Sequence, residues 1–216
     1  MFGIRCPGCG RHGWCPCPQC VGALDPAPAV VAPGVDQVAA LFAHSGVGRS
    51  IVLALKHRDD RSVAAWLGEG LARLRTATAP VDVVTWVPAS ASRLARRGHD
   101  TGRILAREVG RRIDAPVVGL LVRSGGPAQT GRGRADRLGG PALGLERSVA
   151  GRGLGRRRGG GRVLVVDDVV TTGASLAAAA TLLRAAGAAS VTAAVVAVRP
   201  YGVPARVHYN HRTRHL

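Results

Sequence analysis

The sequence predicts an α/β fold, a mainly parallel Rossmann-like sheet flanked by helices, because apolar runs alternate with helical patterns along most of the chain. The most informative stretch is residues 162–176, in which four apolar residues, Val163 to Val166, run into Asp167 and Asp168. A turn, Thr171 to Ser175, then leads into an alanine-rich segment. We interpret the stretch as a strand buried on both faces, followed by a turn and a helix.

The composition indicates a globular protein that attracts anions. The 216 residues suffice for one domain with a small appendage, and 46% of them are hydrophobic. No apolar run is long enough to cross a bilayer, and the first residues lack the apolar core of a signal peptide, so we expect a cytoplasmic protein. The net charge of +17 favours polyanions such as nucleic acid, although an arginine-rich composition bias would give the same charge.

Residues 1–22 are predicted to form a zinc module, because all five cysteines lie there. Two C-x2-C pairs separated by seven residues suit one tetrahedral Zn²⁺ in a structural site, and their members are Cys6, Cys9, Cys17 and Cys20. Cys15 is an alternative to Cys17 as a ligand, and His12 is a weaker substitute.

Residues 23–35 carry three prolines and a glycine, which predicts a linker, and residues 36–80 are predicted to form a second small region. In that region we expect a strand at 38–43 and helices at 47–56 and 63–74. Lys56 is the only lysine of the chain, which hints at a need for a compact ammonium. The alternative is that it merely ends a helix in solvent.

Residues 81–200 are predicted to form the main domain. We expect strands at 81–87, 117–122 and 191–198, besides 163–166, and helices at 101–113 and 172–186. Pro88-Ala89-Ser90 follows the first strand at the edge where open α/β sheets bind ligands. Basic residues after that turn suit a pyrophosphate, because guanidinium groups bind phosphate oxygens in pairs; they include Arg93, Arg96 and Arg97.

Residues 123–161 are rich in Gly and Arg and read as a long basic loop, either a lid or a solvated segment. The loop contains Gln129, Arg132 and Arg134. Residues 201–216 read as a basic tail, without metal-ligand spacing among their histidines.

The turn from Thr171 to Ser175 offers a phosphate site, because unpaired backbone N–H groups and the helix dipole favour an anion at a helix N-terminus. Asp167 and Asp168 suit sugar hydroxyls or a hydrated Mg²⁺. Together they predict a phosphorylated sugar as ligand. The simpler alternative is a buried strand whose acids only cap a helix.

The segment Val-Val-Asp-Asp-Val-Val-Thr-Thr-Gly-Ala-Ser, residues 165–175, resembles the phosphoribosyl-pyrophosphate (PRPP) motif of type I phosphoribosyltransferases. The resemblance implies that fold, with a small hood over the substrate that residues 36–80 would supply. The chain also resembles the ComF family of competence-associated proteins, in the cysteine module and in segments 54–57, 87–90, 96–106 and 129–137. The family usually has an aromatic residue and Asn where this chain has His99 and Asp100.

The resemblance implies displacement at ribose C1′ with pyrophosphate leaving. Asp167 and Asp168 would bind the ribose hydroxyls and help to hold Mg²⁺, and Lys56 joins them as a candidate catalytic residue. The 5′-phosphate would lie in the turn formed by Thr171, Thr172, Gly173, Ala174 and Ser175. The pyrophosphate would meet Ser90, Arg93 and Arg97. Some purine enzymes have an acid at the position of Thr171, where it acts as a base toward the nucleobase. This chain has threonine there, so that position offers the acceptor no carboxylate.

Two functions compete. The first is a Mg²⁺-dependent phosphoribosyltransferase with an unknown acceptor. The second is a non-enzymatic accessory factor for the uptake of single-stranded DNA that uses PRPP as a structural or regulatory ligand. The acid pair and the phosphate turn favour the first function, whereas the basic surface and the cysteine module favour the second.

Overall fold

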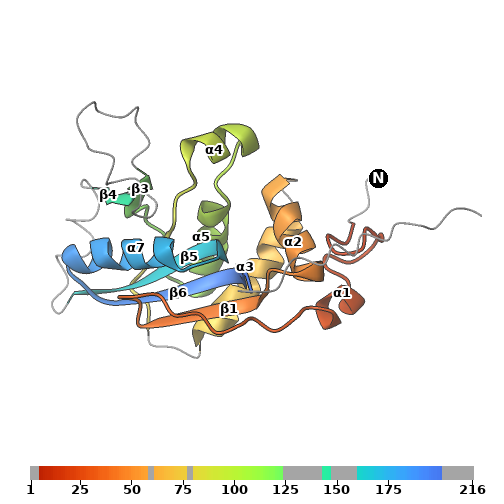
Figure 1. Cartoon of the computed structure of the whole chain (residues 1–216), viewed down its shortest axis with the longest axis horizontal. Helices are drawn as coiled ribbons and strands as arrows, with labels where there is room; N and C mark the ends of the chain where they lie inside the picture. The colour runs from red at the N-terminus through yellow and green to blue at the C-terminus, as the bar shows by residue number, and fades with distance from the viewer. Residues whose placement is uncertain (1–4, 58–60, 77–79, 124–142, 147–159, 201–216) are drawn as a thin grey trace, which may run out of the picture.

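The computed structural model describes residues 5–57, 61–76, 80–123, 143–146 and 160–200 (Figure 1). Its elements, in chain order, are α1 (Pro18–Gly22), β1 (Gln37–Ala43), α2 (Gly46–His57), α3 (Arg61–Thr76), β2 (Val83–Trp86), α4 (Ala91–Arg97), α5 (Thr101–Arg112), β3 (Leu121–Arg123), β4 (Leu143–Leu145), β5 (Gly161–Val170), α7 (Ala174–Ala185) and β6 (Ala188–Val198). None of the helices in these segments is both long and apolar enough to span a bilayer.

A four-stranded parallel sheet forms the centre of the molecule, and it confirms the predicted fold class. The strand order is β1-β6-β5-β2. β5 and β6 occupy the middle, where both faces are covered, and this explains why both segments are almost wholly apolar. The carboxyl ends of all four strands therefore meet at one edge of the sheet, the usual ligand side of an open α/β fold.

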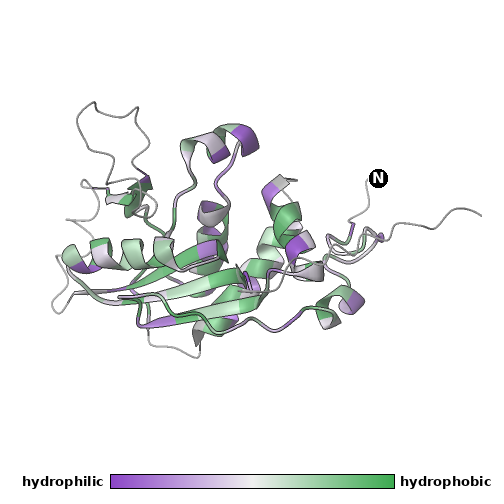
Figure 2. Ribbon diagram, viewed as in Figure 1, coloured by the Kyte–Doolittle hydropathy of each residue, from purple (hydrophilic) through white to green (hydrophobic). Residues whose placement is uncertain are grey.

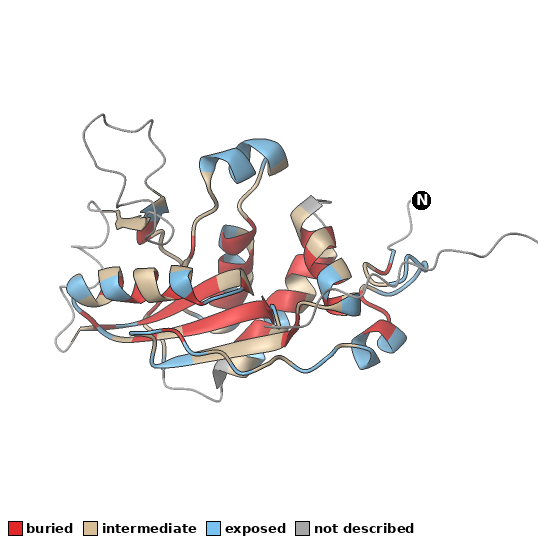
Figure 3. Cartoon of the chain, viewed as in Figure 1, coloured by how far each residue is buried: buried red, intermediate tan, exposed pale blue. Residues whose placement is uncertain are grey.

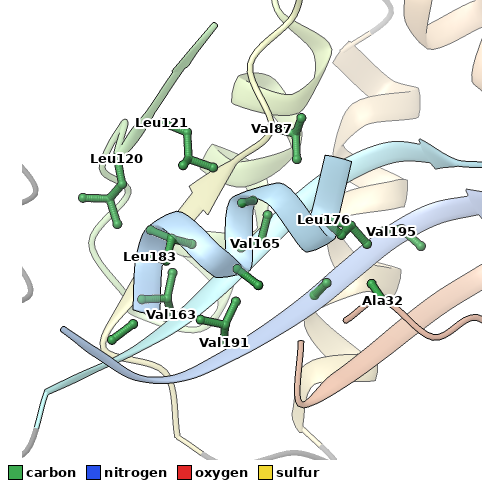
Figure 4. Packing of buried hydrophobic residues seen from close by; sticks show 14 of the residues in the cluster. Ala32, Val87, Leu120, Leu121, Val163, Val165, Leu176, Leu183, Val191 and Val195 are labelled. Atoms are coloured by element: carbon green, nitrogen blue, oxygen red, sulfur yellow. The ribbon is translucent and has the colours of Figure 1, made fainter. Parts of the chain in front are cut away.

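The two faces of the sheet bury different clusters because side chains alternate along each strand. On β5, Val163 and Val165 point to the face covered by α7, where they pack with Leu176 and Leu183 (Figure 4). Leu164 on the same strand points to the opposite face, which α2, α3 and α5 cover. The buried residues thus form layers on both sides of the strands (Figure 3).

The predicted strand at 117–122 is wrong. Val117 makes only an isolated parallel bridge to Val84 of β2. After Val118 the chain leaves the ladder: the N–H of Leu120 is shared between the Val118 carbonyl at 3.0 Å and the Thr85 hydroxyl at 3.2 Å, and it does not continue the backbone pairing with β2. Leu120 then turns into the core beneath α7, and β3 pairs with β4 in a separate antiparallel sheet.

The predicted linker, residues 23–35, is not a free connection. Ala32 is 1% exposed and belongs to the cluster under α7, with Val30 and Val35 packed beside it. At its start, the carbonyl of Asp25 accepts a hydrogen bond from Ala43 at the end of β1. Burial of Ala32, with Val30 and Val35 beside it, therefore fixes this segment along the sheet, whereas Val31 is 84% exposed.

Residues 36–80 contain the predicted strand and two helices, but they do not lie apart from the main domain. β1 pairs with β6 over six register positions, from Gln37 opposite Thr192 to Ala43 opposite Val198. α2 and α3 cover one face of the same sheet. A hood separate from the core is therefore not a feature of the described residues, and a domain boundary at residue 80 is not visible in the packing.

Candidate functional site

The acid pair lies where β5 extends past its neighbour. The ladder between β5 and β2 ends with Trp86 opposite Val166, whereas the ladder with β6 continues to Val170. Asp167 and Asp168 are therefore flanked by a strand on one side only, and both side chains are half-buried. The edge of the sheet beside them, beyond the end of β2, is therefore open.

Asp168 receives two donors on one oxygen. The Lys56 ammonium lies 3.0 Å from Oδ2, and the Thr101 hydroxyl donates to the same atom at 2.9 Å. The Lys56 and Asp168 side chains are only 15% and 16% exposed, so water screens their attraction weakly. The lone lysine and the acid pair, which lie far apart in the sequence, are thus brought together.

Burial and the neighbouring Asp168 charge raise the pKa of Asp167 to about 8, although the N–H of Asp168 and the charges of Lys56 and Arg123 act in the opposite direction. The N–H of Asp168 donates to Asp167 Oδ1 at 2.8 Å. Among the described residues, no protein group donates to Asp167 Oδ2 or to Asp168 Oδ1. These two oxygens are thus available to a ligand.

The turn after β5 has the form expected of an anion site. Gly173 has a φ of +76°, which favours glycine, and α7 begins at Ala174 rather than at the predicted Thr172. Thr171, Thr172 and Ala174 are exposed, and Ser175 is half-buried. The Ala174 N–H donates to the Thr172 hydroxyl at 3.3 Å, and helical bonding begins with the Ala177 N–H. Helix geometry therefore leaves the N–H groups of Ser175 and Leu176 as donors for a phosphate.

The predicted pyrophosphate residues lie on α4, which stands away from the core and buries no residue (Figure 2). Ser90 caps this helix by accepting from the Arg93 N–H. Arg97 is half-buried, and its Nε is buried without a hydrogen-bond partner. Neither guanidinium group is paired with an acid within the described ranges, so the structure does not bring these two arginines into contact with the acid pair.

Sequence reasoning missed two basic residues near the acids. Arg123 donates through Nε to the Pro88 carbonyl at 2.7 Å, and its charge acts on Asp167. His44 follows β1 at the ligand edge; burial first, and then the charge of Lys56, lower its pKa. The only signal for either residue was its position at the end of a strand.

The residues predicted for the basic loop, Gln129, Arg132 and Arg134, lie outside the described residues, as does the predicted basic tail.

The N-terminal cysteines form a cluster whose geometry suits zinc. The Sγ atoms of Cys6, Cys9, Cys17 and Cys20 all lie within 4.8 Å of one another. The Cys9–Cys17 pair is 3.7 Å apart, close to the ~3.8 Å between two sulfurs at tetrahedral angles on one Zn²⁺. Burial alone would raise the pKa of Cys6, but backbone N–H groups, led by that of Cys17, lower it to about 6.

The fifth thiol, Cys15, is not part of this cluster and packs instead against the apolar cluster on the α2 face of the sheet. No disulfide links any of the five cysteines, all of which lie in the described segment. The structure therefore selects the two C-x2-C pairs over the alternative ligand sets.

Several solved structures are similar to this chain at low sequence identity. The structure of the allosteric regulatory enzyme of purine biosynthesis is 20% identical, with a TM-score of 0.44, over 67% of this chain and 30% of that one. Glutamine PRPP amidotransferase from B. subtilis, complexed with ADP and GMP, is 23% identical, with a TM-score of 0.46, over 67% of this chain and 30% of that one. This chain thus spans 30% of the length of both.

Purine phosphoribosyltransferase from Pyrococcus horikoshii Ot3 is 18% identical, with a TM-score of 0.37, over 77% of this chain and 83% of that one. No curated protein matches the chain. Residues 95–214, more than half of the 216, match the model of the phosphoribosyl transferase domain. The chain therefore belongs to the phosphoribosyl transferase domain family.

Proposed function

We propose that the protein binds PRPP with Mg²⁺ and transfers its phosphoribosyl group to an acceptor, with release of pyrophosphate. The observation that carries this proposal is the pair of carboxylates, Asp167 and Asp168, at the open edge of a parallel sheet. They directly precede the turn that leads into the N-terminus of α7. Lys56 lies 3.0 Å from Asp168 in that pair. Membership of the phosphoribosyl transferase domain family supports the same ligand.

Each part of PRPP has a matching group in the chain. The ribose hydroxyls would donate to the two available oxygens, Asp167 Oδ2 and Asp168 Oδ1. The 5′-phosphate would accept from the turn between Thr171 and Ser175 and from the first N–H groups of α7. The pyrophosphate would meet Ser90, Arg93 and Arg97, whose partnerless Nε is a donor suited to an anion.

Mg²⁺ fits this donor set, because carboxylate oxygens are its preferred protein ligands and two of them lack protein donors. Asp167 and Asp168 would hold the ion together with the substrate. When bound, the ion neutralises charge on the pyrophosphate as it leaves.

The reaction breaks the bond between ribose C1′ and the pyrophosphate oxygen and forms one from C1′ to the acceptor. The bonding electrons leave with the pyrophosphate, and positive charge develops on the ribose ring. A bound Mg²⁺ would favour the ionised form of Asp167 despite its raised pKa. The carboxylates of Asp167 and Asp168 would then stabilise the positive charge on the ring, so catalysis is positional and electrostatic. Thr171 offers no carboxylate, so an acceptor that must lose a proton transfers it elsewhere.

We further propose that the chain belongs to the ComF branch, that the cysteine cluster holds a structural Zn²⁺ and that the protein is cytoplasmic. What supports the branch is the cysteine module together with the Ala-Leu-Lys-His segment at 54–57, whose lysine lies at the acid pair. The sulfur distances support zinc.

Release of pyrophosphate tests the transfer. Protein, Mg²⁺ and PRPP are incubated with a panel of purine and pyrimidine bases, and Asp168→Asn serves as the matched variant. The proposal predicts base-dependent release that the variant lacks. Release no faster than in buffer with every base would contradict a transferase acting on nucleobases and favour a protein that only binds PRPP.

A second candidate function is an accessory role with single-stranded DNA. Trp14 in the cysteine module is 71% exposed, and Arg5, Arg11 and His12 are exposed in the same module. An exposed aromatic ring and exposed arginines in one small module suit a stacked base and a phosphate. Arg5 and His12 face each other across an antiparallel bridge, so this small surface is ordered.

Binding of a labelled oligothymidine across a salt series tests this role. We expect affinity that falls steeply with salt and a further loss in Trp14→Ala. An affinity that does not change with salt, or no binding near physiological salt, would argue against it.

A further inference from the structure

We propose that three consecutive residues, His99, Asp100 and Thr101, act as a positioning clamp that holds together three parts of the PRPP site. Each side chain bonds a different element, and the three elements come from distant parts of the sequence. The inference rests on the proposed PRPP site and assigns to it residues that the binding scheme above does not use. The first two are also positions at which this chain departs from the ComF pattern.

Thr101 holds the acid pair. Its hydroxyl donates to Asp168 Oδ2 at 2.9 Å, and the residue is only 4% exposed, so water cannot readily replace this bond. Because Lys56 occupies the same oxygen, the two donors fix the carboxylate plane and leave Asp168 Oδ1 for a ligand. Thr101 thereby orients a group that would bind ribose.

Asp100 holds the turn that precedes α4. One oxygen, Oδ2, accepts from the Ala89 N–H at 3.1 Å and from the Trp86 Nε1 at 3.2 Å. The other oxygen caps α5 by accepting from the Arg103 N–H at 3.3 Å. Asp100, the N-cap of α5, thus fixes the turn that leads to Ser90 to the start of that helix.

His99 holds the end of α2. Its Nε2 lies 3.3 Å from the carbonyl of Leu55, the residue before Lys56. A carbonyl only accepts, so Nε2 must donate in this contact. The clamp therefore fixes the backbone next to the lysine as well as the acid that the lysine contacts.

The clamp is rigid because α5 anchors it. Leu105, Ala106 and Val109 of this helix are fully buried against the sheet. Gly102 allows the close approach, since a Cβ there would lie 3.1 Å from the Val87 carbonyl. The hydrogen bonds of these three side chains therefore start from one fixed point, which is what preorganised binding of a multipart ligand requires.

The test uses variants that keep or remove one donor. Thr101→Val preserves shape but deletes the hydroxyl, and Thr101→Ser keeps it. Calorimetry with Mg²⁺ and PRPP should show affinity weaker by about tenfold or more in Thr101→Val and restored to within about threefold in Thr101→Ser. The matched control is Thr181→Val, which removes an exposed hydroxyl on α7 and should bind like the wild type.

His99 gives an independent arm. His99→Gln places an amide donor near the position of Nε2 and should retain most of the affinity, whereas His99→Leu should not. Melting temperatures are measured alongside, to show that each variant is folded. The inference is overturned if Thr101→Val binds PRPP as tightly as the wild type, or if Thr101→Ser binds as weakly as Thr101→Val. Wild-type protein that fails to bind PRPP would instead contradict the proposed function itself.

Discussion

At the scale of single residues, Lys56 and Asp168 form the ion pair at the centre of the site. The Lys56 ammonium lies 3.0 Å from Asp168 Oδ2, and the two side chains are only 15% and 16% exposed. A buried carboxylate that loses such a partner becomes costly, because only the Thr101 hydroxyl, a neutral donor, then compensates the charge of Asp168.

Lys56→Met should therefore lower the free energy of unfolding by about 1.5–3 kcal/mol, the contribution of a hydrogen bond to a charged group. Urea denaturation measures it. The control is Arg73→Met, which removes a surface pair with Glu69 whose side chains are 79% and 51% exposed, and should cost no more than about 0.5 kcal/mol. Equal losses in the two variants would show that the Lys56 contact contributes no more than a surface pair.

The raised pKa of Asp167 predicts that the stability of the protein depends on pH. Its pKa is raised to about 8 in the folded protein from an ordinary value of 3.8. Between these values the folded state holds a proton that the unfolded state has lost. The free energy of unfolding therefore falls as pH rises through this window, by at most about 1.4 kcal/mol per pH unit, and levels off above pH 8.

Asp167→Asn cannot titrate, but its carbonyl can still accept from the Asp168 N–H. The free energy of unfolding of the wild type minus that of the variant should therefore decrease from pH 5 to pH 8. Denaturant unfolding at each pH gives this difference. A difference that stays constant across the range would mean that the pKa of Asp167 is not raised.

At the scale of elements, the segment 23–35 lies against the turn between β5 and α7. Gly173 has a φ of +76°, and a Cβ there would lie 3.2 Å from the Val31 carbonyl. The segment 23–35, expected to be a linker, thus supports the phosphate turn from outside.

Gly173→Ala should lower the free energy of unfolding by about 1–2 kcal/mol, because its left-handed conformation disfavours a Cβ, and it should also weaken PRPP binding by displacing the turn. Gly187→Ala is the control, since its φ of +95° carries similar strain but a Cβ there meets nothing within 4 Å. Calorimetry and denaturation of both variants separate the effects. If both variants bind PRPP alike, the position of the turn does not govern binding.

The sequence predicted the elements that have strong local patterns. The runs at 163–166 and 191–198 became β5 and β6, since a strand buried on both faces is almost wholly apolar. It failed at 117–122, where the Leu120 N–H bonds the Thr85 hydroxyl and the Val118 carbonyl and the chain turns away from β2. Local patterns carry no information on such a distant partner.

The same limit applies to the site. The acids and the phosphate turn are consecutive, so their spacing was visible in the sequence. Thr101, Arg123 and His44 reach the acids only through the packing of α5, β3 and β1, so no spacing could indicate them. Lys56 was found because its residue type is unique in the chain.

At the scale of the whole molecule, the cysteine module is attached to the helix that carries Lys56. Val47, near the start of α2, packs against the cysteine cluster, and a Cβ on Gly8 would lie 3.0 Å from its Cγ1. Ser45 also bonds Asp25 in the segment that follows the module. Order in the module should therefore support the position of α2.

Loss of zinc should accordingly weaken PRPP binding. Cys20→Ser is expected to lose the metal, to melt at a lower temperature and to bind PRPP less tightly by about 0.5–2 kcal/mol. Cys15→Ser should keep the metal and the affinity, because Cys15 lies outside the cluster. Metal analysis with calorimetry decides: full zinc content in Cys20→Ser would exclude the proposed ligand set.

The central claim is that the edge of the sheet at β5 is a site for PRPP and Mg²⁺, and calorimetry tests it most directly. PRPP is titrated into wild-type protein with and without Mg²⁺, and into the Asp167→Asn/Asp168→Asn variant. The account predicts one saturable site per chain that strengthens with Mg²⁺ and is lost in the variant. No saturable binding by wild-type protein, or equal binding by the variant, would contradict it.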